Sequence, residues 1–325
     1  MKLNVTNVLF YAPLGAVTAQ IPARNPVSVG PPLELMHLYF DEWPTRVAVS
    51  ASGRMFSCYP LGLDYTNTRY QVAELGSNNT EIPFPSAQVN SPPGGAVNYS
   101  TYPPTTKGLL DYLMSVQSVA VDPKDHLWIL DTGRALLSNG TLTTSNLGGP
   151  KLTGGSWPHL ENIPQVRAEP GFYVNVRGDS VYMNAGSGMP ISKVAFGADG
   201  ITLSNDGDVL RASSELFAAA SVMDLGQKGV SDGLDSDSNG IVYAGSVETD
   251  SNVTFNHQNG TVQTYVRDPR IGWTDTFSVA GNYLYFTENQ LWRGASYQSG
   301  IDMRVKPYAS YRVPLLNNAT KIQLV

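Results

Sequence analysis

A chain of 325 residues can bury a large hydrophobic core, and all-β folds of this size often form one domain. Only 15% of the residues are charged, the formal net charge is −6, and no cluster of Lys and Arg is interleaved with aromatic residues. Nucleic acid is therefore not expected as a partner, an anionic membrane surface is not expected either, and no membrane partner is predicted. No apolar stretch is long enough to span a bilayer.

The chain begins like a secretory leader. Met1-Lys2 is followed by an apolar run from Val8 to Val17, and Val17-Thr18-Ala19 has the small residues of a cleavage site ahead of Gln20. These residues predict a signal peptide at positions 1–19 and a single domain at 20–325. The predicted location is the secretory pathway or the extracellular space.

Asn-X-Ser/Thr triplets without a central proline point to the same compartment, although a chain rich in Asn, Ser and Thr forms some of them by chance in ordinary polar turns. Beyond a first triplet at Asn4, the predicted glycosylation sites are Asn78, Asn98, Asn139, Asn252, Asn259 and Asn318.

Cys58 is the only cysteine, so no intrachain disulfide can form, and its place after Phe56-Ser57 predicts a small buried side chain.

Five short hairpins with one pattern follow along the chain. In each, a first strand leads into a turn of Gly, Asn, Asp or Ser, and a second apolar strand runs back. The hairpins span residues 44–57, 116–134, 199–210, 232–244 and 274–286. Recurring hairpins of this kind predict a β-propeller, in which they supply the inner two strands of blades about 40 to 50 residues long.

The spacing of the hairpins is uneven. The gap between Val119 and Ile201 is long enough for a further, degenerate blade, whereas the gap between Ile201 and Leu234 is short for four strands. The loop from Ile82 to Thr106 is dense in Pro, Ser and Asn, and loops of this length in a compact domain are usually functional or disordered. The spacing alone does not determine the number of blades.

The ends of the domain are expected to meet. Residues 33–40 predict a strand that closes the ring by pairing with a C-terminal strand, which would remove an open sheet edge. The two segments predicted as its partner are Tyr311-Arg312-Val313 and Ile322-Gln323-Leu324.

Four stretches resemble the major royal jelly protein and yellow family, in particular its fungal branch. They are Glu42 to Thr45, Ser118 to Asp122 with Leu127 to Arg134, Phe196 to Ile201, and Trp273 to Asp275. The run Leu-Trp-Ile-Leu-Asp-Thr-Gly-Arg at 127–134 is the most specific of them, and the resemblance covers most of the chain from Leu35 to Asn289. It implies a secreted, glycosylated, six-bladed β-propeller. Because the chain looks shorter than family members after Leu152 and after Leu210, one or two blades are expected to be shortened.

Function within this family is diverse. Insect members include dopachrome-converting isomerases and abundant binding or storage proteins. Fungal members include proteins of secondary-metabolite pathways that resemble hetero-Diels–Alderases, which couple a tropolone-derived quinone methide to a humulene-type sesquiterpene. The resemblance therefore implies a pericyclase acting on terpenoid and tropolone substrates as the favoured function, although fold membership alone does not choose among these activities.

The hairpin pattern gathers acids, amides and indoles at one end of the central channel, here called the channel mouth. Such a set predicts a pocket for a small, partly apolar substrate. The predicted catalytic residues are Asp131, Arg134, Asp275 and Glu288. The predicted substrate-binding residues are Glu42, Trp43, Thr45, Gln117, Asp199, Asp232, Trp273 and Asn289.

A pericyclic reaction needs little covalent chemistry, because the protein mainly holds two reactants in a reactive geometry. Trp43 and Trp273 would stack on apolar rings, and Arg134, Thr45 or Asn289 would donate to a carbonyl that gains negative charge. Asp131, Asp275 or Glu288 would serve as general acid or base in forming the quinone methide. The alternative for these acids is structural, since Asp at a hairpin often accepts backbone N–H bonds.

Two other classes of function stay open. Ser231-Asp232-Gly233-Leu234 looks like a strand start of gluconolactonase-type propellers, and Glu42, Asp199 and Asp232 could then bind Ca²⁺ in a metal-dependent lactonase. No metal or other cofactor is expected in the favoured function. The third class is a secreted, non-catalytic protein that binds a pigment or terpenoid, which needs the same apolar pocket. The sequence does not indicate the oligomeric state.

Overall fold

The computed structural model describes most of the chain between residues 28 and 321. Its backbone is described over residues 28–108, 111–121, 125–143, 151–153, 172–176, 180–184, 198–203, 223–228, 231–256 and 258–321. The side chains of the five strands between 151 and 227 are not described. The predicted signal peptide at 1–19 lies outside the described residues.

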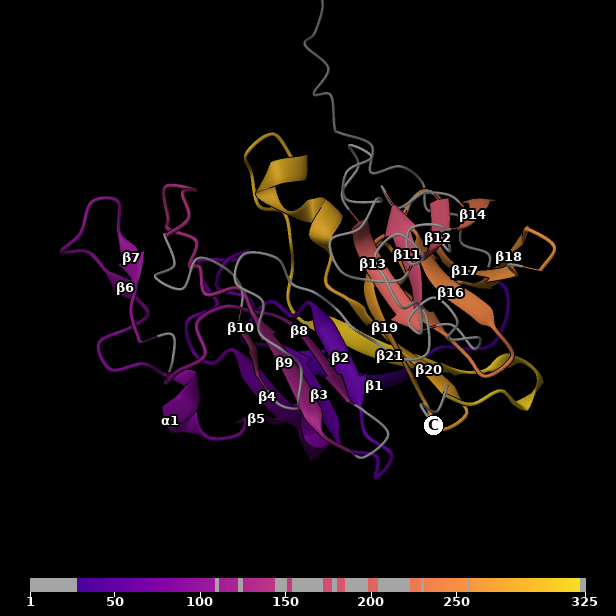
Figure 1. Ribbon diagram of the computed structural model, residues 1–325, viewed down its shortest axis with the longest axis horizontal. Coiled ribbons are helices and arrows are strands. Elements are labelled where there is room, and N and C mark those ends of the chain that lie inside the picture. Colours follow the sequence, from indigo (N-terminus) through magenta and orange to yellow (C-terminus); the bar gives the residue numbers. More distant parts are fainter. Residues whose placement is uncertain are drawn as a thin grey trace, which may run out of the picture.

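Nearly all of the described secondary structure is β-strand, arranged in antiparallel sheets (Figure 1). The first sheet contains β2 (Arg46–Val49), β3 (Met55–Cys58), β4 (Val72–Leu75) and β5 (Glu81–Pro83). The second contains β8 (Val116–Val121), β9 (Leu127–Asp131) and β10 (Lys151–Thr153). The third has the order β13 (Ala198–Leu203), β11 (Phe172–Val176), β12 (Ser180–Asn184) and β14 (Met223–Gln227).

The C-terminal third forms two more four-stranded sheets. The fourth contains β15 (Leu234–Ser236), β16 (Ile241–Ser246), β17 (Ser251–Asn256) and β18 (Thr261–Arg267). The fifth has the order β19 (Thr274–Ala280), β20 (Tyr283–Glu288), β21 (Tyr308–Pro314) and β1 (Glu34–Tyr39). The smaller elements are β6 (Val97–Asn98), β7 (Thr105–Thr106), the helix α1 (Ala87–Asn90), and the 3₁₀ turns η1 (Ser77–Asn79), η2 (Leu291–Arg293), η3 (Ala295–Tyr297) and η4 (Leu316–Asn318).

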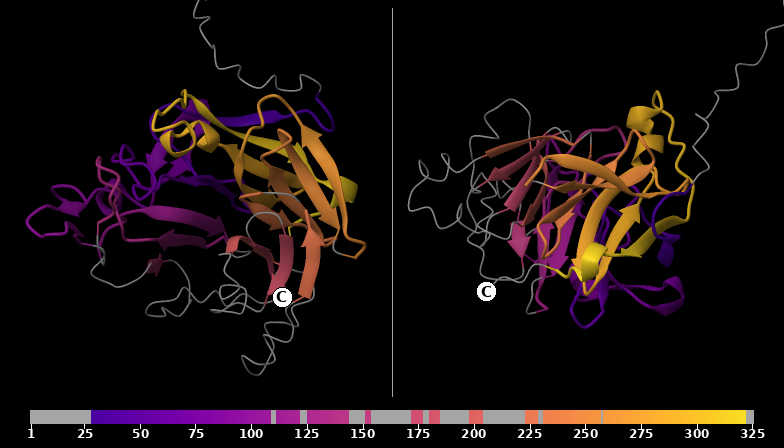
Figure 2. Two further views of the ribbon diagram at one scale, coloured as in Figure 1. Left: turned by 90° about the horizontal axis from the view of Figure 1, so that it is seen from above. Right: turned by 90° about the vertical axis from the view of Figure 1, so that its right-hand side faces the viewer.

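The sheets follow one another around a common axis (Figure 2). Their innermost strands pack side by side, with β19 against β2, β2 against β8, β13 against β15, and β15 against β19. This arrangement is that of a β-propeller, so the predicted fold class is confirmed. Five blade-like sheets are present in the described part of the chain, and the six-blade count stays a prediction.

Four of the five predicted hairpins form within a sheet, as β2–β3, β8–β9, β15–β16 and β19–β20. The remaining one was expected at 199–210. Its first strand is β13, which pairs with β11 through contacts such as Ile201 with Val174, and Val209-Leu210 lies outside the described residues. The third sheet therefore takes its innermost strand from later in the chain than its middle strands, an order that the hairpin pattern did not predict.

The N-terminal strand closes the fifth sheet. β1 pairs antiparallel with β21, from Glu34 opposite Arg312 to Tyr39 opposite Tyr308. This confirms one of the two predicted partners, Tyr311-Arg312-Val313, whereas Ile322-Gln323-Leu324 lies outside the described residues. The pairing covers an edge strand that would otherwise expose unpaired N–H and C=O groups. None of the described helices is long and apolar enough to cross a membrane.

Candidate functional site

The starts of the innermost strands come together at one end of the ring, as the hairpin pattern predicts. The hydroxyl of Thr45, just before β2, donates to the carbonyl of Gln117 on β8 at 3.3 Å. The hydroxyl of Thr276 on β19 donates to the carbonyl of Thr45 at 3.0 Å. Gly233, before β15, lies so close to β19 that an added Cβ would stand 2.3 Å from the carbonyl oxygen of Asp275. These contacts build the channel mouth.

Two of the predicted catalytic acids bind the backbone instead of facing the channel mouth. Asp131 is fully buried at the end of β9, and its carboxylate accepts N–H bonds from Met114 at 2.7 Å, Ser115 at 2.9 Å and Gly133 at 2.8 Å. It lies opposite Val116, the first residue of β8. A carboxylate engaged in this way fixes the chain that enters the innermost strand.

Glu288 occupies the same position in the fifth sheet. It lies opposite Thr274, the first residue of β19, and accepts N–H bonds from Gly272 at 2.9 Å and Trp273 at 3.2 Å. Its other oxygen contacts the hydroxyl of Thr274. The repeated geometry matches the structural alternative for acids at a hairpin, and we call it the carboxylate clamp.

Glu42 and Trp43 lie beneath the surface. Both oxygens of Glu42 accept backbone N–H bonds, from Arg69 at 2.6 Å and Tyr70 at 3.2 Å, and burial raises the pKa of this carboxyl to about 7 despite these two bonds. The indole N–H of Trp43 donates to the carbonyl of Asn289 at 2.8 Å. The ring is only 2% exposed and lies 5.1 Å from the guanidinium of Arg304, so its face is covered by protein.

Four of the predicted residues form two hydrogen-bonded pairs near the channel mouth. The side-chain amide of Asn289 donates to the carboxylate of Asp275, and both residues are buried. The indole N–H of Trp273 donates to Asp232 at 2.9 Å, and its half-buried ring lies 5.2 Å from that of Tyr297. Asp275 and Asp232 therefore also accept hydrogen bonds from the protein, but from side-chain rather than backbone donors.

Three further predicted residues have separate positions. Arg134 is exposed beyond the end of β9. Gln117 is half-buried on β8. Asp199 lies in β13 at an irregularity in its pairing with β11, and its side chain is not among those described.

The predicted glycosylation site at Asn252 is wrong for this fold. Asn252 lies on β17, an inner strand of the fourth sheet, and has no exposed surface; its side-chain oxygen accepts a hydrogen bond from the hydroxyl of Thr274 at 2.7 Å. The folded protein has no space for a glycan on this side chain. Asn98 is half-buried, and the other predicted acceptors, Asn78, Asn139, Asn259 and Asn318, are exposed. Glycosylation at these five positions stays a prediction.

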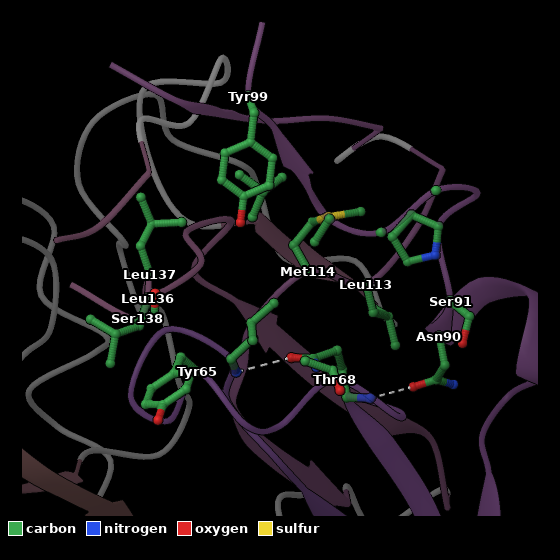
Figure 3. A pocket seen from close by; sticks show the side chains of 17 residues that line it. Tyr65, Thr68, Asn90, Ser91, Tyr99, Leu113, Met114, Leu136, Leu137 and Ser138 are labelled. Atoms are coloured by element: carbon green, nitrogen blue, oxygen red, sulfur yellow. Dashed lines mark hydrogen bonds between the residues drawn. The ribbon is translucent and has the colours of Figure 1, made fainter. Parts of the chain in front are cut away.

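A pocket of about 460 Å³ opens between loops of the first and second sheets (Figure 3). Its floor consists of the buried side chains of Leu113 and Met114, and in Figure 3 the hydroxyl of Tyr99 points into the space between Leu137 and Met114. The lining residues are Leu61, Tyr65, Thr68, Gln71, Asn90, Ser91, Pro92, Gly94, Gly95, Ala96, Val97, Tyr99, Leu113, Met114, Leu136, Leu137 and Ser138.

The two amides of this pocket are used by the protein. Asn90 accepts N–H bonds from Gln71 and Val72, both at 2.8 Å, and donates to the carbonyls of Phe84 and Ser86. The side-chain oxygen of Gln71 accepts from two backbone N–H groups, and its nitrogen donates to a carbonyl. The polar groups left to meet a ligand are therefore hydroxyls, among them those of Tyr65, Thr68, Tyr99 and Ser138.

Sequence reasoning placed the ligand at the channel mouth and missed this pocket. The usable signal was the long loop from Ile82 to Thr106, which provides one wall through Asn90 and Tyr99. A second wall follows β9, at Leu136 and Leu137, and the third comes from the loop between β3 and β4. Within the described residues, no group of three or more His, Cys, Asp or Glu side chains is placed to hold a metal ion.

Comparisons with known proteins give distant structural likenesses. No protein-family model and no curated protein matches the chain. Solved structures similar to it include the PQQ-bound aldose sugar dehydrogenase of Streptomyces coelicolor, with 8% identity over 87% of this chain and 100% of that one and a TM-score of 0.40. A luciferin-regenerating enzyme has 13% identity over 88% and 81%, with a TM-score of 0.37. A gluconolactonase of Xanthomonas campestris has 11% identity over 90% and 97%, with a TM-score of 0.35. These neighbours are enzymes, and such distant likenesses carry no conclusion about activity.

Proposed function

We propose that this propeller takes up an uncharged, partly apolar small molecule in the pocket of its first two sheets and catalyses a pericyclic reaction there. The reaction class is that of the hetero-Diels–Alderases which the sequence resembles, coupling a tropolone-type quinone methide with a humulene-type sesquiterpene. One observation carries the proposal: the 17 described residues that line a pocket of about 460 Å³ include no Asp, Glu, Lys, Arg or His.

The volume and the lining suit such a ligand. Pockets for small organic molecules usually measure about 300 to 1,000 Å³ and are mostly apolar, with a few polar groups that fix orientation. Here the floor is Leu113 and Met114, and the aromatic walls are Tyr65 and Tyr99. The described lining offers no charged side chain to a charged ligand, and the ammonium of nearby Lys107 already binds the carbonyl of Gly94 at 2.9 Å, so the lining favours a neutral molecule.

A cycloaddition requires positioning more than proton transfer, which accords with a pocket whose ionisable groups are tyrosines. The hydroxyls of Tyr65 and Tyr99 can donate to a carbonyl that gains negative charge as the new bonds form. Asp131 and Glu288, which the sequence predicted as general acids or bases, are poorly placed for proton transfer, because each would have to give up its bonds to backbone N–H groups.

The test is an incubation of the purified protein with a tropolone-type quinone-methide precursor and a humulene-type alkene. Cycloadduct yield and enantiomeric excess are compared with a protein-free sample and an EDTA-treated sample. An excess of one stereoisomer that survives EDTA supports the proposal. A racemic product at background yield contradicts it for this substrate pair, and lactone hydrolysis with added Ca²⁺ then tests the lactonase alternative, whose predicted ligand Glu42 already accepts two N–H bonds.

Because the described lining residues include no Asp, Glu, Lys, Arg or His, the pocket also suits a second candidate, a non-catalytic carrier of a neutral terpenoid or pigment. The two candidates differ in what leaves the pocket. A carrier returns the bound molecule unchanged and does not accelerate its conversion, whereas a pericyclase releases adduct at a rate above that of the solution reaction. Recovery and analysis of the ligand after a long incubation therefore separate them.

A further inference from the structure

Large apolar side chains are exposed on three loops, two of which line the pocket. Tyr102 is fully exposed at the tip of the β6–β7 hairpin, and Val305 is 61% exposed in the loop between β20 and β21. Figure 1 shows that hairpin and the loop carrying η2 and η3 projecting on the same side of the sheets. We call this set the apolar rim; its members are Leu63, Tyr65, Tyr99, Tyr102, Ile301, Met303 and Val305.

An inward-facing ion pair joins two of these loops. Arg304 and Asp64 form a salt bridge of 2.8 Å, with only 14% and 4% of their side chains exposed. The guanidinium also binds Asp302 at 2.6 Å and covers the ring of Trp43. Leu63 and Tyr65 flank Asp64 in the sequence, and Met303 and Val305 flank Arg304, so the ion pair brings together the two loop segments that carry these four exposed apolar side chains. The side chains of Arg304 and Asp64 are largely buried, whereas that of Asp302 is 47% exposed beside them.

The backbone beneath the rim is fixed by hydrogen bonds. The N–H of Met303 donates to the carbonyl of Arg293 at 2.9 Å. Val305 is held by the side chain of Gln290, which accepts from its N–H at 2.9 Å and donates to its carbonyl at 2.7 Å. The apolar side chains are thus presented on an ordered loop.

The rim is continuous with the pocket, because Tyr65 and Tyr99 belong to both. Most exposed charges at its edge are paired: Arg69 pairs with Asp41, and Asp302 pairs with Arg304. The ammonium of Lys306 binds the backbone carbonyl of Asp41. A surface that meets this rim must therefore be apolar or uncharged. A net charge of −6 disfavours an anionic one.

We infer that the apolar rim docks the protein on an uncharged lipid surface, such as a phosphatidylcholine bilayer, with the pocket opening toward the lipid. Tyr, Met and aliphatic side chains on separate loop tips suit the interfacial zone of a bilayer, where apolar groups are buried and phenol hydroxyls stay hydrated. Docking would also deliver a neutral, lipid-soluble ligand from the bilayer to the pocket, and this part of the inference rests on the proposed function. The sequence-based prediction of no membrane partner was argued from charge, and that argument applies to anionic surfaces rather than to uncharged ones.

The test is co-sedimentation with phosphatidylcholine vesicles in the absence of substrate. The double variant Met303→Ser/Val305→Ser removes two rim side chains outside the pocket and should lower the partition coefficient about tenfold, because both lose their burial in lipid. Ile82→Ser is the matched control, since Ile82 is 57% exposed but lies on β5 outside the rim. Circular dichroism and the thermal midpoint confirm that each variant is folded.

Binding that falls in the double variant but not in Ile82→Ser supports the inference. It is overturned if wild-type protein does not bind these vesicles, if binding appears only with phosphatidylserine, or if the double variant instead abolishes a concentration-dependent dimer, which would mean that a second copy covers the rim. The vesicle assay needs no substrate. A protein that binds vesicles without forming cycloadduct contradicts only the proposed function, and one that forms cycloadduct without binding vesicles contradicts only the docking.

Discussion

Replacing Asp131 by Ala should destabilise the propeller strongly. The carboxylate has no exposed surface and accepts three backbone N–H bonds between 2.7 and 2.9 Å. A hydrogen bond to a charged acceptor contributes about 1.5 to 3 kcal/mol, and buried N–H groups without partners cost a similar amount. Because a water molecule could replace part of the lost contacts and the three bonds are not additive, we expect a loss of about 4 kcal/mol in the free energy of unfolding.

Urea unfolding followed by tryptophan fluorescence measures this loss as a lower midpoint. Asp111→Ala is the control, because Asp111 is exposed before β8, and its midpoint should stay near that of the wild type. Glu288→Ala removes the corresponding clamp of the fifth sheet and should behave like Asp131→Ala. If Asp131→Ala unfolds at the wild-type midpoint yet loses all activity, the carboxylate acts in chemistry and the clamp argument fails.

Three more predictions concern buried groups. Gly233→Ala should cost about 2 kcal/mol in urea unfolding, because its Cβ would stand 2.3 Å from the carbonyl oxygen of Asp275; an unchanged midpoint would contradict that close approach. The carboxyl of Glu42 has its pKa raised from 4.5 to about 7, so the folded state binds its proton more tightly than the unfolded state. Its contribution to the free energy of unfolding should fall by about 3 kcal/mol between pH 4.5 and 7. Urea unfolding of the wild type at pH 5 and at pH 8 measures this loss, and Glu42→Gln, which has no carboxyl to titrate, should not show it. Cys58 is fully buried, and burial raises the pKa of its thiol to about 12, so a thiol reagent should label it only after unfolding; rapid labelling of the native protein would place it at the surface.

The sequence predicted the elements whose pattern is local. Four hairpins could be read from short strands and turn residues, and the closing strand followed from the need to cover a sheet edge. The third sheet departs from this pattern because β13 pairs with a strand that precedes it in the chain by more than 20 residues. The order of strands in that sheet depends on tertiary pairing, which no local signal specifies.

The site was harder to predict, because its residues acquire their environment from distant parts of the chain. Trp43 starts a blade and was expected to face a substrate, but Arg304 and Asn289 cover it from a loop about 250 residues later. Asn252 satisfies a sequence motif that carries no information about burial. Asp131 was expected to be catalytic or structural, and only the three N–H groups around it distinguish the two.

The pocket is formed by separate segments at residues 61–71, 90–99, 113–114 and 136–138, and none of them carries a catalytic motif. A long loop rich in Pro, Ser and Asn was the only available indication, and it did not identify the residues opposite. Leu136 and Leu137 follow β9 and would be read as ordinary apolar residues of a connection. Their role in a pocket wall becomes apparent only when the first two sheets are placed side by side.

The most direct test of the central claim is to place a charge in the pocket and measure the stereochemistry of the product. Leu137→Asp adds a carboxylate to a lining without charged residues, whereas Leu137→Met keeps the wall apolar at similar volume. Both are assayed for enantiomeric excess of the cycloadduct beside the wild type, after their folding has been confirmed. We expect the wild type and Leu137→Met to give the same predominant stereoisomer and Leu137→Asp to give a racemic product at background yield. Unchanged enantiomeric excess in a folded Leu137→Asp would show that the reaction does not take place in this pocket.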